Sequence, residues 1–529
     1  MTASRSTDYW IAFSSVLLAA LALRWLFFTG YFGSDEVTYT WNALKISQGI
    51  WTPSHYIGSV RLGVNLPVGF LFWLFGHSEF VANLWSLLCS LGEIALVFLI
   101  ANRFWGLKAA VASALLLAFT PLHAHYAGRL MADAPLGFFI TLSFYALFRG
   151  DQDSSWRWHL VAGLAAGFVW WIKSAVALAY VPVFALFLLR ERKVATKWLI
   201  MAAGFGGMVA INSLIFWIAE GDFWKILRMT TSGVPEFVLQ EGLRTEPQYY
   251  LRYLLLDVKH TWLLGPLALI GLFYWARQRF TDGNLTNVAI WGIGLLGSFS
   301  LFVVSISPLG LITKQVNYML IFLAPLALLG GYALSKLPAA ASNLVIGLVV
   351  VTGVFGTALE QLAISSFVAN SKSTLAFASA VHNTPVYGMT NAVRYSGYTE
   401  IYANDPDYIP GIRDIKNIDG DLTALSHKPA DRNGFVAYAI IDLETSNWGH
   451  NGVYTSLKSI PTCWQRFSTL TPTNHGAGAK LVASSMRMVA GLPYDQMLAD
   501  KLDSMLNPKP AYVFGISPSC LADKASWRS

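Results

Sequence analysis

The amino-acid sequence predicts a polytopic α-helical membrane protein with a smaller soluble α/β domain at its C-terminal end. Of its 529 residues, 55% are hydrophobic and only 13% are charged, whereas about a quarter of the residues in a soluble domain are charged. Apolar runs of membrane-spanning length recur along the first two-thirds of the chain, and the remainder has the mixed texture of a soluble domain. These observations exclude an ordinary soluble enzyme and a disordered chain.

The membrane part is expected to contain about eleven transmembrane helices, because a spanning helix needs about 20 predominantly apolar residues. The apolar runs cover residues 10–29, 80–101, 108–125, 133–148, 158–172, 174–189, 198–219, 261–275, 288–305, 318–334 and 343–365. We therefore expect a transmembrane domain over residues 1–365 and a second domain over residues 366–529.

The segments between these runs indicate the orientation of the chain. Every second segment is short and basic, as cytoplasmic loops are, and the others are longer, above all residues 30–79 and 220–260. The basic segments contain Arg5, Arg103, Lys108, Arg149, Arg157, Arg190, Arg192, Lys193, Lys197, Arg277, Arg279 and Lys336. We expect the N-terminus in the cytoplasm and the C-terminal domain on the outer side of the cytoplasmic (inner) membrane. Basic residues dispersed in this way do not support nucleic-acid binding.

The first outer segment, residues 30–79, is expected to form amphipathic helices at the membrane surface. Its start has Ser34 as a helix N-cap and Gly49 as a helix stop, with apolar residues at helical spacing between them. Asp35 and Glu36 fall in the first turn, where acids commonly only complement the helix dipole. Adjacent helix positions point about 100° apart, so alternatively Asp35 faces a substrate as a general base while the other acid anchors the backbone.

A second polar cluster, between the third and fourth predicted helices, contains His123, His125, Arg129 and Asp133. An acid that opens an apolar helix requires a partner and marks an inward-facing position. The two histidines lack a third firm ligand in the sequence nearby, so we predict hydrogen-bonding roles for them and no metal site.

Further cations are expected on the same outer face, namely Arg61, Lys173 and Lys314, the last of which is followed by Tyr318. Lys173 has apolar residues on both sides, so its ammonium group either reaches an interface or pairs with an anion. The sequence thus places acids and cations from distant parts of the chain on one membrane surface.

The C-terminal part is predicted to be a small α/β domain, because short β-type runs are separated by turn residues. These runs cover residues 384–387, 434–441 and 512–516, and a helical pattern covers residues 494–505. Cys463 and Cys520 lie in this part and can form a disulfide if it is extracytoplasmic. The sequence alone leaves their pairing open.

This combination of charges suits one reaction in particular. Cations at a membrane surface can hold the phosphate of a lipid whose tail stays in the bilayer, and a carboxylate can take the proton of an attacking hydroxyl. Transfer of a sugar from a polyprenyl phosphate needs both groups and no cofactor, and attack opposite to the phosphate inverts the anomeric carbon. A secondary transporter or lipid flippase is the alternative, but it favours two similar halves and charges near the bilayer midplane.

The ordered series of these segments resembles the C-type (GT-C) integral membrane glycosyltransferases, in the branch that contains protein O-mannosyltransferases and the lipid A aminoarabinose transferase. The matching segments are Asp35-Glu36, Leu66-Pro67, residues 74–86, the loop from Arg129 to Asp133, the Lys173 segment and residues 314–325. The sequence departs from the family pattern at residues 65–67 and at Asn317, where a His-Pro-Pro run and an arginine are commoner.

The resemblance implies a GT-C fold and an inverting transfer from a polyprenyl-phosphate sugar to a glycan, lipid or protein acceptor at the lipid bilayer. It implies Asp35 as the base with Glu36 beside it, and Asp133 as the residue that orients the acceptor or the base. Contacts with the donor phosphate are implied for Lys173, Lys314 and Tyr318, with Arg61 and Arg129 as further candidates.

Overall fold

The computed structural model describes residues 7–192, 195–233, 246–256, 260–306, 309–381, 384–402, 411–446, 454–472, 474, 476–489 and 496–522. Arg5 and Lys193, which contribute to the predicted orientation, lie outside these ranges. The chain forms two compact units. The first contains Met1–Phe28, Asn42–Gly76 and Phe80–Thr357, and the second contains Thr29–Trp41, His77–Glu79 and Ala358–Ser529.

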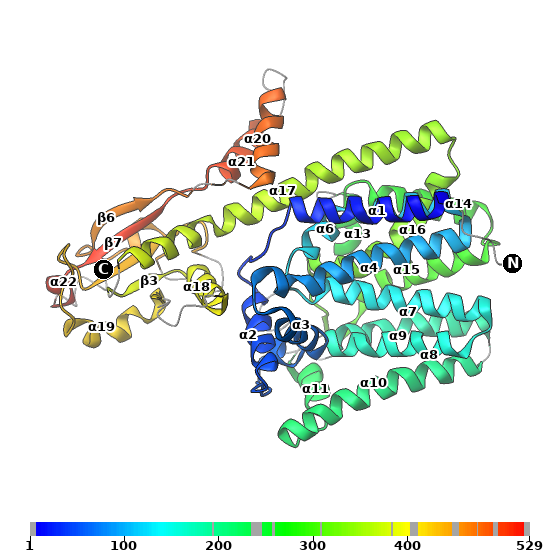
Figure 1. The fold of residues 1–529 in the computed structure, drawn as a ribbon, viewed down its shortest axis with the longest axis horizontal. Helices are drawn as coiled ribbons and strands as arrows, with labels where there is room; N and C mark the ends of the chain where they lie inside the picture. Colours follow the sequence, from blue (N-terminus) through cyan, green and yellow to red (C-terminus); the bar gives the residue numbers. More distant parts are fainter. Residues whose placement is uncertain are drawn as a thin grey trace. The chain divides into compact units, whose positions relative to one another are not determined.

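The first unit is almost entirely helical (Figure 1). The helices that contribute to it are α1 (Thr7–Leu26), α2 (Glu36–Ser47), α3 (Leu62–Phe75), α4 (Glu79–Trp105), α5 (Leu107–Ala118), α6 (Pro121–Ala127), α7 (Asp133–Asp153), α8 (Trp156–Ile172), α9 (Ser174–Glu191), α10 (Thr196–Glu220), α11 (Lys225–Arg228), α13 (Tyr249–Leu255), α14 (Leu264–Arg277), α15 (Gly283–Leu301), α16 (Leu320–Ser335) and the first part of α17 (Ala339–Ala380). Every predicted apolar run coincides with one or two of these helices, which confirms a polytopic helical membrane protein.

The number of membrane spans stays a prediction. Within the described ranges, seven helices are long and apolar enough to cross a bilayer, or eight if the bent pair α5 and α6 forms one span. Among the other helices on the predicted runs, α14 is apolar but shorter than a span.

Two of the predicted helices are wrong in detail. The helix predicted over residues 108–125 is broken, because α5 and α6 meet at an angle of 66°. Pro121 opens α6, and a proline, which has no backbone N–H, fits the first turn of a helix better than its interior. The helix predicted over residues 288–305 ends early, because Val303–Ile306 forms strand β1, which pairs antiparallel with β2 (Leu309–Leu311).

Helix α16 forms the core of the first unit. It packs against α5, α7, α14 and α15, and 89% of its membrane-spanning window is buried, as expected for a helix that is apolar on all sides. Close helix contacts depend on small residues. A Cβ atom on Gly163 of α8 would lie 2.2 Å from the carbonyl oxygen of Met201 on α10, so this crossing requires glycine.

The second unit contains a five-stranded sheet with the strand order β4-β3-β5-β7-β6. Its elements are β3 (Val386–Gly388), α18 (Thr390–Tyr402), β4 (Ile412–Asp414), α19 (Ile418–Ser426), β5 (Ala437–Ile441), β6 (Gln465–Leu470), α20 (Ala477–Val489), α21 (Gln496–Leu506), β7 (Ala511–Ile516) and α22 (Pro518–Ala522). The β4, β3 and β5 strands are parallel, and β7 and β6 continue the sheet antiparallel. The predicted α/β character is confirmed, with the predicted strands at β3, β5 and β7.

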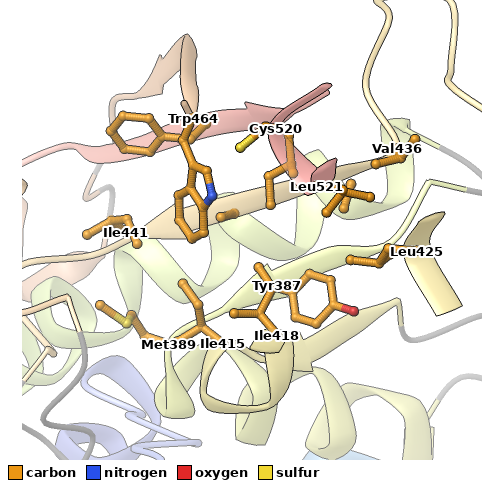
Figure 2. Packing of buried hydrophobic residues seen from close by; sticks show 14 residues of the cluster. Tyr387, Met389, Ile415, Ile418, Leu425, Val436, Ile441, Trp464, Cys520 and Leu521 are labelled. Carbon is orange, nitrogen blue, oxygen red and sulfur yellow. The ribbon is translucent and has the colours of Figure 1, made fainter. Parts of the chain in front are cut away.

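The central strand β5 is buried along its whole length, because alternate residues of the strand belong to two apolar clusters on the two faces of the sheet. Figure 2 shows one of these clusters, which contains Trp464, Ile418 and Leu521. A disulfide between Cys463 and Cys520 connects the segment before β6 to α22. The structure therefore answers the question that the sequence left open about these two cysteines.

Candidate functional site

The two adjacent acids of the first outer segment have different environments. Helix α2 begins at Glu36, so Asp35 precedes it, and the carbonyl oxygen of Asp35 accepts the N–H of Tyr39 at 3.0 Å. The predicted cap at Ser34 is therefore wrong. The backbone N–H of Ser34 instead donates to Oε2 of Glu36 at 2.8 Å, because the helix starts one residue later than the sequence pattern indicated.

This arrangement separates the roles of the two acids. Glu36 is 1% exposed and accepts the N–H of Ser34 at the start of α2, which is the anchoring role expected of it in the alternative that makes Asp35 the base. Asp35 is only half-buried, and its Oδ2 accepts the hydroxyl of buried Tyr39 at 3.3 Å. Of the two, Asp35 is the carboxylate that a substrate hydroxyl can approach.

Helix α18 and Glu79 fix the segment that carries Asp35. Oε1 of Glu79 accepts the hydroxyl of Tyr398 at 3.1 Å and the N–H of Tyr31 at 3.3 Å. Arg394 donates to the carbonyl oxygen of Gly33 at 3.1 Å, and the rings of Tyr31 and Tyr398 lie 4.6 Å apart. All these residues belong to the second unit. Sequence reasoning missed Tyr398 and Glu79 as contributors to the site.

In the first unit, three remote parts of the chain form a buried polar cluster, which we call the Asp133 cluster. It contains Asp133 at the start of α7, Lys173 between α8 and α9, and Asn317 and Tyr318 just before α16. Nζ of Lys173 donates to Oδ1 of Asp133 at 2.7 Å, and Nδ2 of Asn317 donates to the same oxygen at 3.1 Å. The Lys173 ammonium also lies 4.6 Å from the centre of the Tyr318 ring, within the range of a cation–π interaction.

The Asp133 cluster contains hydrogen-bonding groups that its own contacts do not use. Asp133 is 1% exposed and Lys173 is 9% exposed, so each charge depends on the other, because a buried unpaired charge is costly. An ammonium group has three N–H donors, of which one goes to Asp133. In the part of the chain that the structure describes, Oδ2 of Asp133 is buried without a hydrogen-bond partner. Lys173 therefore keeps N–H donors for an anion, and Oδ2 of Asp133 keeps an acceptor site that is closed to solvent in this structure.

The other predicted cations have separate contacts. Arg129 is buried, donates to Nε2 of His125 at 3.2 Å and lies 5.1 Å from the Tyr126 ring centre. Lys314 is 3% exposed and donates to the carbonyl oxygen of Ile312 at 2.9 Å. Burial lowers the pKa of Lys314 to about 8, and this effect outweighs the opposing influence of Glu246.

Arg61 and the nearby departure from the family pattern lie at the start of α3. Arg61 is half-buried and precedes the first residue of this helix. Asn65, which stands where the family commonly has a histidine, is fully buried and donates to the carbonyl oxygens of Gly58 at 3.0 Å and Ser59 at 3.2 Å. In this structure Asn65 therefore stabilises the turn that leads into α3.

A buried network fixes α6, which precedes the loop from Arg129 to Asp133. Arg24 donates to Oγ of Ser90 at 2.9 Å and to Nδ1 of His123 at 2.7 Å. Since Nδ1 accepts, Nε2 of His123 is the nitrogen that donates to Oε2 of Glu93 at 3.1 Å. Thr141 of α7 donates to the other Glu93 oxygen at 3.0 Å. The hydrogen bonds of His123 and Glu93 therefore join α1, α4, α6 and α7.

Comparisons with known proteins identify similar sequences and similar folds. The sequence model of the family described as dolichyl-phosphate-mannose-protein mannosyltransferase matches residues 64–217, a stretch that includes Asp133 and Lys173. A curated relative, the undecaprenyl phosphate-alpha-4-amino-4-deoxy-L-arabinose arabinosyl transferase of Edwardsiella ictaluri (strain 93-146), is 24% identical over 324 residues. That alignment covers 56% of this chain and 54% of the relative, so it spans about half the length of the curated protein.

Two solved structures share the fold. The crystal structure of ArnT from Cupriavidus metallidurans in the apo state has a TM-score of 0.56 at 16% identity, covering 88% of this chain and 97% of that chain. The same protein bound to undecaprenyl phosphate has a TM-score of 0.54 at 16% identity, covering 89% of this chain and 97% of that chain. These likenesses confirm the fold that the sequence resemblance predicted.

Proposed function

We propose that this chain is a member of the C-type (GT-C) superfamily of integral membrane glycosyltransferases, to which its similar sequences and folds point, and that it transfers a sugar from a polyprenyl-phosphate carrier to a hydroxyl acceptor. The observation that carries the proposal is the Asp133 cluster, in which a buried lysine keeps N–H donors for an anion. The name of the curated relative identifies an undecaprenyl-phosphate sugar as its donor, and the bound structure of ArnT contains undecaprenyl phosphate.

On the donor side, Lys173 holds the phosphate through the N–H groups that Asp133 does not use. Asp133 and Tyr318 keep the ammonium group in place, and the unused Asp133 oxygen accepts a hydroxyl of the substrate. Lys314, Arg61 and Arg129 are further candidates for the donor phosphate. A phosphate leaving group needs stabilisation of its charge rather than a separate proton donor, so fixed cations are sufficient.

On the acceptor side, Asp35 takes the proton of the attacking hydroxyl as a general base. Glu36 supports it by holding the start of α2, and α18 holds the segment through Glu79 and Gly33. The hydroxyl attacks opposite to the phosphate, so the configuration at the anomeric carbon is inverted.

We further propose that the reaction takes place on the outer face of the cytoplasmic membrane. The disulfide between Cys463 and Cys520 supports an extracytoplasmic location of the domain over residues 366–529, because disulfides persist in oxidising compartments. The short basic segments between the predicted helices support a cytoplasmic N-terminus. A glycan, a lipid such as lipid A, or a protein can supply the acceptor hydroxyl.

Reconstitution with labelled donors tests the reaction class. The purified protein in liposomes is given a panel of polyprenyl-phosphate sugars and an envelope extract as acceptor. The proposal predicts that the label moves to an acceptor while free polyprenyl phosphate is released in equal amount. A flippase would instead move an intact labelled lipid between the leaflets, and that result would contradict the proposal.

Tyr398→Phe tests the support that α18 gives to Asp35. The variant loses a hydrogen bond to a carboxylate, worth about 1.5–3 kcal/mol, and we expect kcat to fall about tenfold or more while donor affinity stays unchanged. Tyr438→Phe is the matched control. The hydroxyl of Tyr438, a residue of β5, also donates to a carboxylate, that of Asp431, at 2.6 Å. Equal kcat values for the two variants, measured in the reconstituted assay, would show that Tyr398 has only a structural role.

The pKa of Lys314 predicts a pH dependence of donor binding. Since burial lowers this pKa to about 8, the side chain is cationic below that pH and increasingly neutral above it. If Lys314 contacts the donor phosphate, polyprenyl-phosphate affinity should fall about tenfold as the pH rises through 8, in line with the loss of a charge-assisted bond. Lys314→Arg should remove this decline, because arginine stays protonated. Polyprenyl-phosphate affinity is measured for the wild type and for Lys314→Arg at a series of pH values around 8. If affinity has the same pH dependence in both proteins, Lys314 is excluded from the phosphate site.

A further inference from the structure

Helices α20 and α21 of the second unit form a pair with an unusually apolar exposed surface. Met488 near the end of α20 is 86% exposed, and Met497 and Leu498 at the start of α21 are 74% and 51% exposed. The two helices pack against each other, and Figure 1 shows them side by side next to α17, from which they rise steeply. We call them the α20–α21 hairpin. Large apolar side chains gathered at one end of a hairpin mark an interaction surface.

The exposed apolar residues of helix α17 indicate what the surface of the hairpin contacts. Its residues Leu344, Leu348 and Val351 are 75%, 50% and 68% exposed and follow one another at helical spacing. This apolar stripe lies within the predicted span over residues 343–365, where an exposed apolar stripe faces lipid. At 100° per residue, Ala358 and Leu362 continue the same stripe along the helix.

The start of α20 sits on this continuation. The N–H of Gly478 donates to Oε1 of Gln361 at 2.6 Å, and Nδ2 of Asn474 donates to the carbonyl oxygen of Leu362 at 3.5 Å. A Cβ atom on Gly478 would lie 2.4 Å from the carbonyl oxygen of Ala358, so the backbones meet directly. The hairpin thus leaves α17 from its lipid-facing side, and it does so in the last turns of the predicted span.

We propose that the α20–α21 hairpin lies in the outer lipid interface of the membrane, with Met488, Met497 and Leu498 inserted between the lipids. A helix pair that rises steeply from a spanning helix at its exit lies closer to the membrane plane than to the membrane normal, as interfacial amphipathic helices do. Lys480 and Arg487 on α20 are exposed and can reach lipid phosphates with their long side chains. Lipid is favoured over a protein partner because the contact continues a surface of α17 that already faces lipid.

The functional consequence concerns the second unit, which also contains the segment with Asp35. An interfacial hairpin attaches this unit to the membrane at a point other than the spanning part of α17. The proposal depends on the membrane location of α17 but not on the sugar chemistry. It can therefore fail while the glycosyltransferase proposal stands, and the reverse is also possible.

Nitroxide labels test this location in the full-length protein in phosphatidylethanolamine and phosphatidylglycerol liposomes. Met488→Cys and Met497→Cys are labelled singly, since Cys89 is buried and the other two cysteines form the disulfide. Asp503→Cys, exposed on another side of α21, and Leu457→Cys, a partly exposed apolar site elsewhere in the unit, are the matched controls. Accessibility to oxygen, which is enriched in lipid, and to the water-soluble reagent NiEDDA is then measured by power saturation.

We expect labels at 488 and 497 to be several-fold less accessible to NiEDDA and more accessible to oxygen than labels at 503 and 457. Equal NiEDDA accessibility at all four positions would place the hairpin in water and overturn the proposal. Labels at 488 and 497 that are shielded from both reagents would also overturn it, because that result identifies a protein partner or a second copy of the chain. The labelled side chains are exposed, so folding is expected to survive, and the thermal unfolding midpoint of each variant compared with that of the wild type verifies this.

Discussion

Replacing Asp35 with asparagine is expected to lower kcat about 10²–10⁴-fold, the usual contribution of a general base. Asparagine has nearly the same shape, and its amide oxygen can still accept the Tyr39 hydroxyl that now contacts Oδ2 of Asp35. It cannot take a proton from the acceptor hydroxyl. Single-turnover transfer with a bound labelled donor measures the effect, and polyprenyl-phosphate affinity should change by no more than about twofold, as for a group that acts only in the transition state.

Glu36→Gln is the matched control for this experiment. The neighbouring side chain is buried and accepts the N–H of Ser34, and glutamine keeps an oxygen that can do the same. We therefore expect a far smaller loss of kcat than for Asp35→Asn. Near-normal turnover by Asp35→Asn together with an inactive Glu36→Gln would show that the two acids have the opposite roles.

Replacing Lys173 with methionine is expected to weaken the binding of polyprenyl phosphate about 10–100-fold, because a charge-assisted hydrogen bond contributes about 1.5–3 kcal/mol. The variant should also unfold more easily. It leaves Asp133 as a buried charge without its ammonium partner, and breaking such a pair costs about 3–5 kcal/mol. A titration with undecaprenyl phosphate and a thermal unfolding measurement in the same detergent distinguish the two effects.

The double variant Asp133→Asn, Lys173→Met separates binding from folding. It removes both charges, so much of the lost stability should return, but the cation for the phosphate is still missing and binding should stay weak. Lys173→Arg keeps a cation beside Asp133, so this variant should bind undecaprenyl phosphate more tightly than either the single Lys173→Met variant or the double variant. Wild-type affinity in the Lys173→Met protein would remove this lysine from the donor site.

Much of the fold is encoded in local patterns. Apolar runs gave the helices, because a membrane helix must be apolar over its whole length, and turn residues around short β-type runs gave β3, β5 and β7. The strand β1 was missed because Val303–Ile306 continues the apolar run of α15, and periodicity alone cannot separate a short strand from a helix there. The bend at Pro121 has a signal in the sequence, but the apolar run on both sides concealed it.

The site could be predicted only in part. Sequence indicated that Asp133 requires a partner and that Lys173 reaches an interface or an anion, and the structure joins the two. Asn317 and Tyr398 were missed because they contact acids 184 and 319 residues away, and spacing along the chain contains no information about such contacts. The different surroundings of Asp35 and Glu36 follow from the residue at which α2 begins, and this boundary shifts by a residue or two in any sequence-based prediction.

A structure of the reconstituted protein with bound undecaprenyl phosphate tests the central claim most directly. The account predicts a phosphate oxygen within about 3 Å of the Lys173 ammonium, the distance of a charge-assisted hydrogen bond, with the Asp35 carboxylate open to the opposite side of the bond to be cleaved. A phosphate bound away from Lys173, or an Asp35 side chain closed off from the substrate in that complex, would contradict it.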